Sequence, residues 1–196
     1  MIPSKIYHIY NHGNANDNLF LCDENYRYFL QKYGEYIKPI VHTYAFCLLP
    51  NHFHFLVQVQ EEDILTNLSG FKNLAGLKLE KRIVLQFSNF FNAYTKAFNK
   101  MYDRKGKLFL TPFQRKSVTH PWQFLNTWKY IHYNPVRHQF TQDPFDWPFS
   151  SIHDYRQNKD HRVLISEAQS LSESNLGFVS TKDFKPDWND FIEFDY

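Results

Sequence analysis

The chain has 196 residues, a length that fits one domain of ordinary size with an appended tail. Hydrophobic residues make up 43% of it and aromatic residues 19%, enough for a packed core with some rings left for stacking on bases. No apolar run is long enough to cross a membrane, and the opening residues MIPSKIYHIY lack the apolar region of a signal peptide. We therefore expect a cytoplasmic protein with no membrane partner, in which Cys22 and Cys47 are reduced thiols.

Charge is unevenly spread along the chain, although the formal net charge is only +2. Residues 160–196 contain eight acidic and three basic residues, which leaves 12 acidic and 19 basic residues in 1–159. Within the latter, the stretch 96–116 has seven basic residues against Asp103 alone. Such a stretch favours a polyanionic partner through counterion release, and a solvated helix face explains it equally well.

The first half of the chain alternates between strand and helix patterns. Residues 5–10 alternate as a short strand does and lead into the turn-forming stretch 11–14. Residues 24–37 have helical spacing of large side chains. Two apolar runs, 41–49 and 52–60, are separated by a tight break and predict an antiparallel hairpin.

Helix patterns dominate the second half. Residues 64–102 are mainly helical in pattern, and residues 108–118 are extended, although Pro112 argues against a central strand there. A helix is predicted over 121–133, ending there because Pro135 pushes the preceding residue out of the helical region. Locally pairing strands mixed with helices predict an α+β fold with an antiparallel sheet and helices packed on one side.

Two histidines stand two apart in the second strand of the hairpin. Because side chains alternate across a strand, His52 and His54 point to one face while Phe53 and Phe55 point to the other. Two imidazoles at that spacing can bind a divalent metal if a third ligand approaches from another element. By itself the motif is weak, and a pair of half-exposed strand histidines is the competing interpretation.

A tyrosine and an asparagine share one face of the predicted 121–133 helix and its end. Tyr130 and Asn134 are four residues apart, so Asn134 could supply the third metal ligand. A phenol is a poor nucleophile at neutral pH, and it can attack phosphorus where a metal polarises the scissile phosphate. With 13 tyrosines in the chain, an ordinary core tyrosine is the competing interpretation.

Together these residues resemble a known family. The stretch PNHFH at 50–54 resembles the histidine–hydrophobic–histidine motif of the HUH nucleases, and YIHYNPV at 130–136 resembles the tyrosine helix of the single-tyrosine transposases. The set is similar, more specifically, to the transposase-like proteins associated with repetitive extragenic palindromes (REP). Three further stretches in the same order fit that group, namely YHIYNHGN, GKLFLTPFQRK and DWPFSS.

The resemblance implies a ferredoxin-like α+β domain over residues 1–157, with the HUH motif on a central strand and an acidic tail over 158–196 outside it. It implies that Tyr130 forms a 5′-phosphotyrosine link to single-stranded DNA. It also implies that His52, His54 and Asn134 hold Mg²⁺ or Mn²⁺. Members of the family act as dimers on hairpin DNA with a short flanking sequence, which predicts a homodimer here.

One departure from the family is visible, because His12 follows Asn11 where the family often has arginine. A phosphate contact from that corner is therefore in doubt. The residues expected to contact DNA come from the basic stretch, and they are Arg104, Lys105, Lys107, Arg115 and Lys116. Aromatic candidates for stacking on bases, each also a candidate for the core, are Phe109, Phe113, Trp122 and Trp128.

The leading hypothesis is a metal-dependent single-stranded DNA endonuclease and strand transferase, that is, a transposase. Three alternatives remain beside it. A regulator derived from a transposase would bind DNA hairpins without cutting them. A metal hydrolase would activate water at the two histidines, and no carboxylate motif beside them favours it. A structural α+β domain would make every motif a coincidence.

Overall fold

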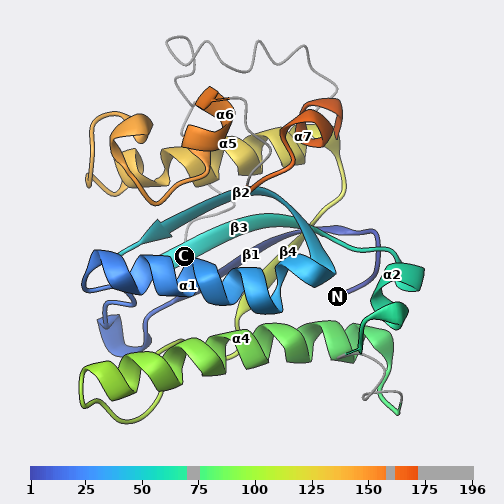
Figure 1. Ribbon diagram of the computed structural model, residues 1–196. Helices are drawn as coiled ribbons and strands as arrows, with labels where there is room; N and C mark the ends of the chain where they lie inside the picture. The colour runs from blue at the N-terminus through green and yellow to red at the C-terminus, as the bar shows by residue number, and fades with distance from the viewer. Residues whose placement is uncertain (70–75, 158–161, 172–196) are drawn as a thin grey trace.

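A computed structural model describes residues 1–69, 76–157 and 162–171 of the chain. Four strands and several helices follow one another in mixed order (Figure 1). In chain order the strands and helices are β1 Ile6–His12, α1 Asp23–Tyr36, β2 Val41–Leu49, β3 His52–Val59, α2 Glu62–Asn67, α4 Leu79–Met101, β4 Gln114–Val118, α5 Pro121–Arg137, α6 Ile152–Gln157 and α7 Ile165–Leu171, with short 3₁₀ turns at Asn14–Asn16, Lys38–Ile40 and Pro144–Asp146.

The four strands form one antiparallel sheet in the order β2-β3-β1-β4. The hairpin predicted from the sequence is β2 and β3, and β3 lies inside the sheet between β2 and β1. With α1 between β1 and β2, and α4 between β3 and β4, this order is that of a ferredoxin-like fold. The predicted α+β class and the central position of the HUH strand are thus confirmed.

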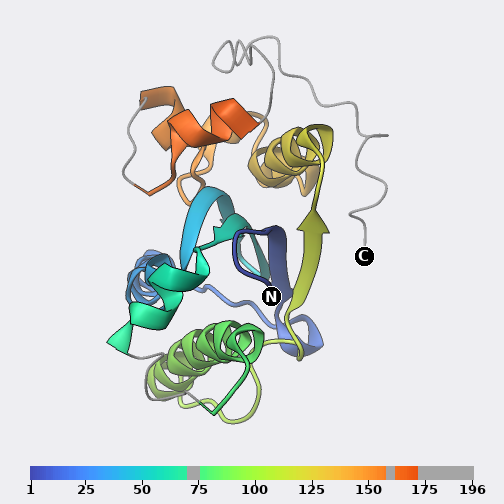
Figure 2. The same cartoon turned by 90° about the vertical axis from the view of Figure 1, so that its right-hand side faces the viewer.

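Helices cover both faces of the sheet, whereas the sequence predicted them on one side. Helices α1 and α4 pack together on one face, and α5 lies on the other against β2 and β3 (Figures 1 and 2). The physical reason lies in β3, where seven of the eight residues are buried, so neither face of this strand can be left to solvent. The prediction of helices on one side therefore holds for α1 and α4 and is wrong for α5, which covers the opposite face.

Helix α5 runs to Arg137 and contains Pro135, whereas the sequence predicted an end at Asn134. Proline removes a backbone donor and crowds the preceding turn, so it normally ends or kinks a helix. Here residues 130–135 are all buried, and the His138 amide still donates to the Asn134 carbonyl at 3.0 Å. Burial of this turn against the sheet outweighs the local preference, and it keeps Asn134 helical beneath the sheet face.

Proline 112 precedes β4 rather than interrupting it, and β4 is an edge strand paired with β1 alone among the described residues. At the opposite edge, chain segments beyond α5 cover β2: the Leu48 amide donates to the Phe149 carbonyl at 3.0 Å and the Leu164 amide to the Thr43 carbonyl at 2.9 Å. An edge strand covered in this way is closed to further pairing.

Part of the predicted tail belongs to this cover. Val163, Ile165 and Ala168 are buried in the core, so residues 162–171 are packed although they belong to the tail that the sequence placed outside the domain. Their apolar spacing was too short to show a helix against the surrounding polar residues. Residues 158–161 and 172–196 lie outside the described part of the chain, and the domain boundary at 157 stays a prediction.

Across the described helices, none is both long enough and apolar enough to span a bilayer.

Candidate active site

Strand β3 places His52 and His54 on the sheet face that α5 covers. Both are buried, with 2% and 1% of their surface exposed, and their ring centroids lie 5.3 Å apart. Phe53 and Phe55 point to the opposite face, where their rings meet Phe29 of α1. The alternation predicted from the sequence is therefore present, and the competing idea of half-exposed histidines is wrong.

An asparagine oxygen lies beside each ring nitrogen of His52. Burial lowers the pKa of His52 to about 3, so the ring is neutral near pH 7 and carries one proton. Its Nδ1 lies 2.7 Å from the Asn51 Oδ1 and its Nε2 lies 2.9 Å from the Asn134 Oδ1. A proton on Nδ1 donates to Asn51 and leaves the lone pair of Nε2 pointing toward Asn134, whereas a proton on Nε2 donates to Asn134.

With the proton on Nδ1, two acceptors face one another at the contact between His52 and Asn134. The Asn134 Oδ1 and the His52 Nε2 each offer a lone pair, while the Asn134 Nδ2 is buried without a hydrogen-bond partner among the described residues. Such a pair is stable if a cation lies between the two atoms or if the amide is turned so that its nitrogen donates. Asn134 is wholly buried, so solvent does not reach the amide group whose orientation differs between these two arrangements.

His54 is held by a second histidine. Its Nδ1 lies 3.0 Å from Nε2 of His8 on β1, and their rings stack with centroids 5.1 Å apart. Burial, followed by the neighbouring histidines, lowers the pKa of His54 well below its usual value, so this ring is also neutral. The His54 Nε2 is buried and has no hydrogen-bond partner among the described residues. If Nδ1 donates to His8, Nε2 presents an uncommitted lone pair.

Tyr130 comes to the same place from α5. Its ring centroid lies 5.2 Å from that of His54, edge to face, and the Arg137 guanidinium lies 5.6 Å from the Tyr130 ring centroid. Burial raises the pKa of Tyr130, while the nearby Asn134 side chain and the charge of Arg137 act in the opposite direction. The phenol is 4% exposed. The four residues predicted to do the chemistry are thus brought together by β3 and α5.

This donor set fits a hard divalent cation. Within the described ranges no group of three His, Cys, Asp or Glu side chains could hold a metal, so any site here needs an amide oxygen beside the two histidines. The 2.9 Å between the His52 nitrogen and the Asn134 oxygen is the separation of adjacent ligands in an octahedral shell with bonds of about 2.1 Å. The uncommitted His54 nitrogen lies on the same face.

Sequence reasoning missed three further histidines around these two. His8 supports His54, while His12 and His138 flank His52 with ring centroids 4.8 and 4.7 Å away. A signal for two of them was present, because residues 8 and 12 of the first strand share a face. Only the β1–β3 register, which pairs His12 with His52, shows that this face is the one with the HUH pair.

The basic residues predicted to contact DNA do not lie together. Lys116 pairs with His8 across β1 and β4, so it is on the face of the site, whereas Arg115 pairs with Ile9 and points to the α4 face. Neighbouring residues of a strand face opposite ways, so Arg115 and Lys116 do not both lie on the face of the site, and the DNA contacts expected of them stay a prediction. Lys105 and Lys107 are exposed, and Arg104 is ion-paired with Asp17.

Among the aromatic candidates, only Trp122 is exposed. It stands at the start of α5, 57% exposed, with its ring parallel to that of His120. Phe109, Phe113 and Trp128 are buried in the core. In the DWPFSS stretch, the Ser151 hydroxyl lies 2.7 Å from Nε2 of His132, a contact that anchors α5 on the far side of its active face.

Comparison with known proteins agrees with the motifs. A protein of Haemophilus influenzae, named provisionally as a REP-associated tyrosine transposase, is 32% identical over 113 residues, which cover 57% of this chain and 58% of the relative. The match therefore spans less than two thirds of that relative's length. No protein family model matches the chain.

The fold comparison covers more of the chain. A solved structure of a REP-associated tyrosine transposase bound to a REP hairpin superimposes with a TM-score of 0.59, covering 83% of this chain and 86% of that one at 17% identity. At that identity the likeness concerns the fold. The resemblance to the REP-associated tyrosine transposases that the motifs predict is therefore confirmed, by sequence over part of the chain and by fold over most of it.

Proposed function

We propose that this protein is a transposase that nicks single-stranded DNA beside a hairpin, with Tyr130 as nucleophile. The observation that carries the proposal is the convergence of Tyr130, His52, His54 and Asn134 on one face of the sheet. The names of the relatives support the class of reaction, and the structural relative is bound to a REP hairpin.

His52, His54 and Asn134 would hold Mg²⁺ or Mn²⁺. Each would offer a neutral donor, because burial keeps both imidazoles unprotonated and an amide carries no charge. When bound there, a divalent cation would draw negative charge from the oxygens of the scissile phosphate. Asn51 and His8 would serve as positioning residues, since each lies at hydrogen-bond distance from the Nδ1 of one of the two rings and leaves its Nε2 to the site.

Tyr130 would attack the phosphorus of the scissile phosphate and remain joined to the 5′-phosphate end of the broken strand. One phosphorus–oxygen bond forms to the phenol and one breaks to the 3′ oxygen. The phenol gives up a proton and the leaving oxygen gains one, so the exchange needs no water and no external energy source. The positive charge of Arg137, beside the Tyr130 ring, favours the phenolate form of Tyr130 that the attack requires.

Binding and assembly complete the proposal. Lys116 on the site face, with Lys105 and Lys107 on the loop before β4, would hold the phosphates of the strand, and Arg104 would support that loop through Asp17. We further propose that the protein acts as a homodimer and in the cytoplasm. Both statements rest on the family resemblance and on DNA as substrate.

Nicking of a labelled hairpin oligonucleotide with a single-stranded flank tests the proposal. We expect cleavage in Mn²⁺ or Mg²⁺ that chelation abolishes and added metal restores. His52→Ala should lose it, whereas His42→Ala, on β2 outside the site, should keep it. Cleavage that survives chelation or His52→Ala would contradict the metal-assisted reaction.

The burial of Tyr130 favours a second candidate. A phenol with 4% of its surface exposed and a raised pKa is a weak nucleophile until DNA displaces its neighbours. A regulator that binds hairpins without cutting would keep Tyr130 as a core residue. Tight hairpin binding with no nick in any divalent metal would support this candidate over the transposase.

A further inference from the structure

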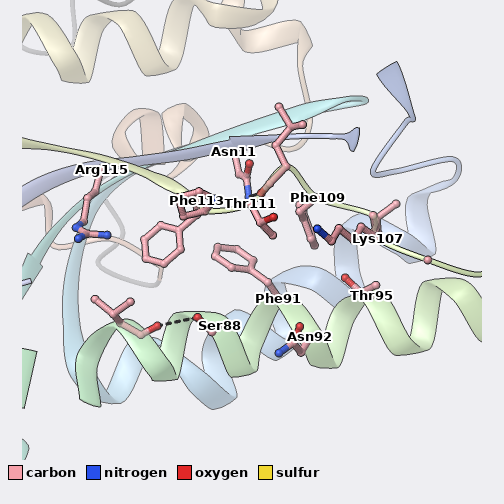
Figure 3. A pocket seen from close by; sticks show the side chains of 15 residues that line it. Asn11, Ser88, Phe91, Asn92, Thr95, Lys107, Phe109, Thr111, Phe113 and Arg115 are labelled. Atoms are coloured by element: carbon pink, nitrogen blue, oxygen red, sulfur yellow. Dashed lines mark hydrogen bonds between the residues drawn. The ribbon is translucent and has the colours of Figure 1, made fainter. Parts of the chain in front are cut away.

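A cavity of about 560 Å³ lies on the face of the sheet away from His52 and His54. It is open to solvent between α4 and the segment 106–115 (Figure 3). Its volume falls within the range of about 300–1,000 Å³ that is typical of small-molecule sites. Of its lining residues, the proposed nicking reaction uses Lys107 alone.

Aromatic rings form the inner wall of this cavity. Phe91 of α4 lies 5.2 Å from Phe109 and 5.5 Å from Phe113, measured between ring centroids. Figure 3 shows these three rings gathered between helix and segment. Phe91 and Phe113 are each 7% exposed, so a planar group would pack against the small part of this wall that the cavity leaves open.

The rest of the lining mixes apolar residues (Val84, Leu108, Leu110 and Pro112) with polar and charged groups. Ser88, Asn92 and Thr95 face the cavity from α4, and amide and hydroxyl groups of this kind can recognise the edge of a base. Exposed cations complete the lining, since Arg115 lies with its guanidinium 5.8 Å from the Phe113 ring centroid and Lys107 stands further along the same segment. An apolar ligand would gain nothing from the two cations, whereas a nucleotide would use both surfaces.

We propose that this cavity takes one unpaired base from the single-stranded flank of the DNA, an inference that rests on the proposed function. The base packs against the Phe91 and Phe113 rings, its edge meets Asn92 and Thr95, and its phosphate lies against Arg115. The cavity would thus read the flank at a distance from the bond that is cut.

Strand β4 provides the route between the two places. Lys116 points to the site face and Arg115 to the cavity face, and β4 is the edge strand at this side of the sheet. A DNA backbone that crosses this edge therefore meets one cation on each face. This explains why two adjacent basic residues on an edge strand both serve binding although they point in opposite directions.

Abasic scanning of the flank tests the proposal without any cleavage. The full chain carrying Tyr130→Phe is titrated with fluorescent hairpins in which each flank nucleotide in turn lacks its base. We expect one flank position to weaken binding about ten-fold, the loss of one stacked base. Equal affinities across the flank, or a response confined to the hairpin loop, would overturn the proposal.

A matched pair of variants on α4 then locates that base. Asn92→Trp places a large ring at the cavity, while Asn89→Trp makes the same change at an exposed position outside the lining. In Asn92→Trp the intact and abasic hairpins should bind alike, and in Asn89→Trp the ten-fold difference should persist. A difference that persists in both variants puts the base elsewhere. Because binding is measured with an uncleaving variant, failure here leaves the nicking reaction untouched, and failure to nick leaves this result standing.

Discussion

The two faces of the sheet are built from the same strands and do opposite things. On the α1 and α4 face, Phe55 stacks on Tyr33 with ring centroids 4.3 Å apart, in a continuous aromatic core. On the α5 face, His54 meets His8 and Tyr130, and within the described part of the chain the His54 Nε2 and the Asn134 Nδ2 are buried without hydrogen-bond partners. Burying polar side chains lowers the stability of the fold unless hydrogen bonds replace the ones that these groups made with water. One face of the sheet is thus packed with aromatic rings, whereas the other carries the buried polar cluster on which the proposed chemistry depends.

The largest expected effect is a difference in stability between variants of two adjacent β3 residues that point to opposite faces of the sheet. Phe55→Ala should lower the free energy of unfolding by about 3–5 kcal/mol, because it opens a cavity in the aromatic core. His54→Ala should lower it much less and abolish nicking. The free energy of unfolding is measured by urea denaturation with tryptophan fluorescence as the signal. Nicking is measured on the folded protein. Equal losses of stability for the two variants would break the distinction.

The second largest effect is a loss of folding stability in acid, caused by the buried histidines. Burial holds the pKa of His8, His52 and His132 at about 3, below the ordinary value of 6.5. The unfolded chain therefore takes up protons below pH 6.5 that the folded chain does not. Stability is full above that pH and falls as the pH drops from 6.5 toward 3, by about 1.4 kcal/mol per unit for each histidine.

His132→Gln gives the control for this pH dependence, because His132 lies on α5 beside Ser151 and away from the HUH pair. The slope of unfolding free energy against pH between 6.5 and 5 should fall by about 1.4 kcal/mol per unit. An unchanged slope in this variant would show that His132 titrates normally in the folded protein.

A smaller effect concerns salt. Lys116→Ala and Arg115→Ala should each reduce the slope of log affinity against log salt by about one, because each would lose one phosphate contact. Arg104→Ala should change the slope less and destabilise the 103–107 loop, since Arg104 is bound to Asp17. A change for Lys116 but none for Arg115 would show that the DNA stays on the site face.

Local patterns were enough to predict much of this molecule. The period-two alternation of residues 52–55 predicts both the strand and the separation of histidines from phenylalanines, because a strand dictates which neighbours share a face. The helical pairing of Tyr130 with Asn134 holds as well. These predictions needed only the geometry of one element.

Predictions that depended on packing between elements were less successful. The contact of His8 with His54 requires the β1–β3 register, and the continuation of α5 through Pro135 requires burial against β2 and β3. The direction of Arg115 depends on where β4 begins to pair. Residues 162–171 pack because β2 has an edge to cover, which no local pattern reveals.

Covalent capture of the DNA tests the central claim most directly. The protein is incubated with labelled hairpin DNA and Mn²⁺, resolved under denaturing conditions, and digested so that the modified peptide is identified by mass spectrometry. We predict a nucleotide adduct on Tyr130 that is lost in Tyr130→Phe and kept in Tyr10→Phe, Tyr133→Phe and Tyr94→Phe. An adduct on one of these other tyrosines, or none in any divalent metal while the hairpin still binds, would contradict the assignment of Tyr130 as nucleophile.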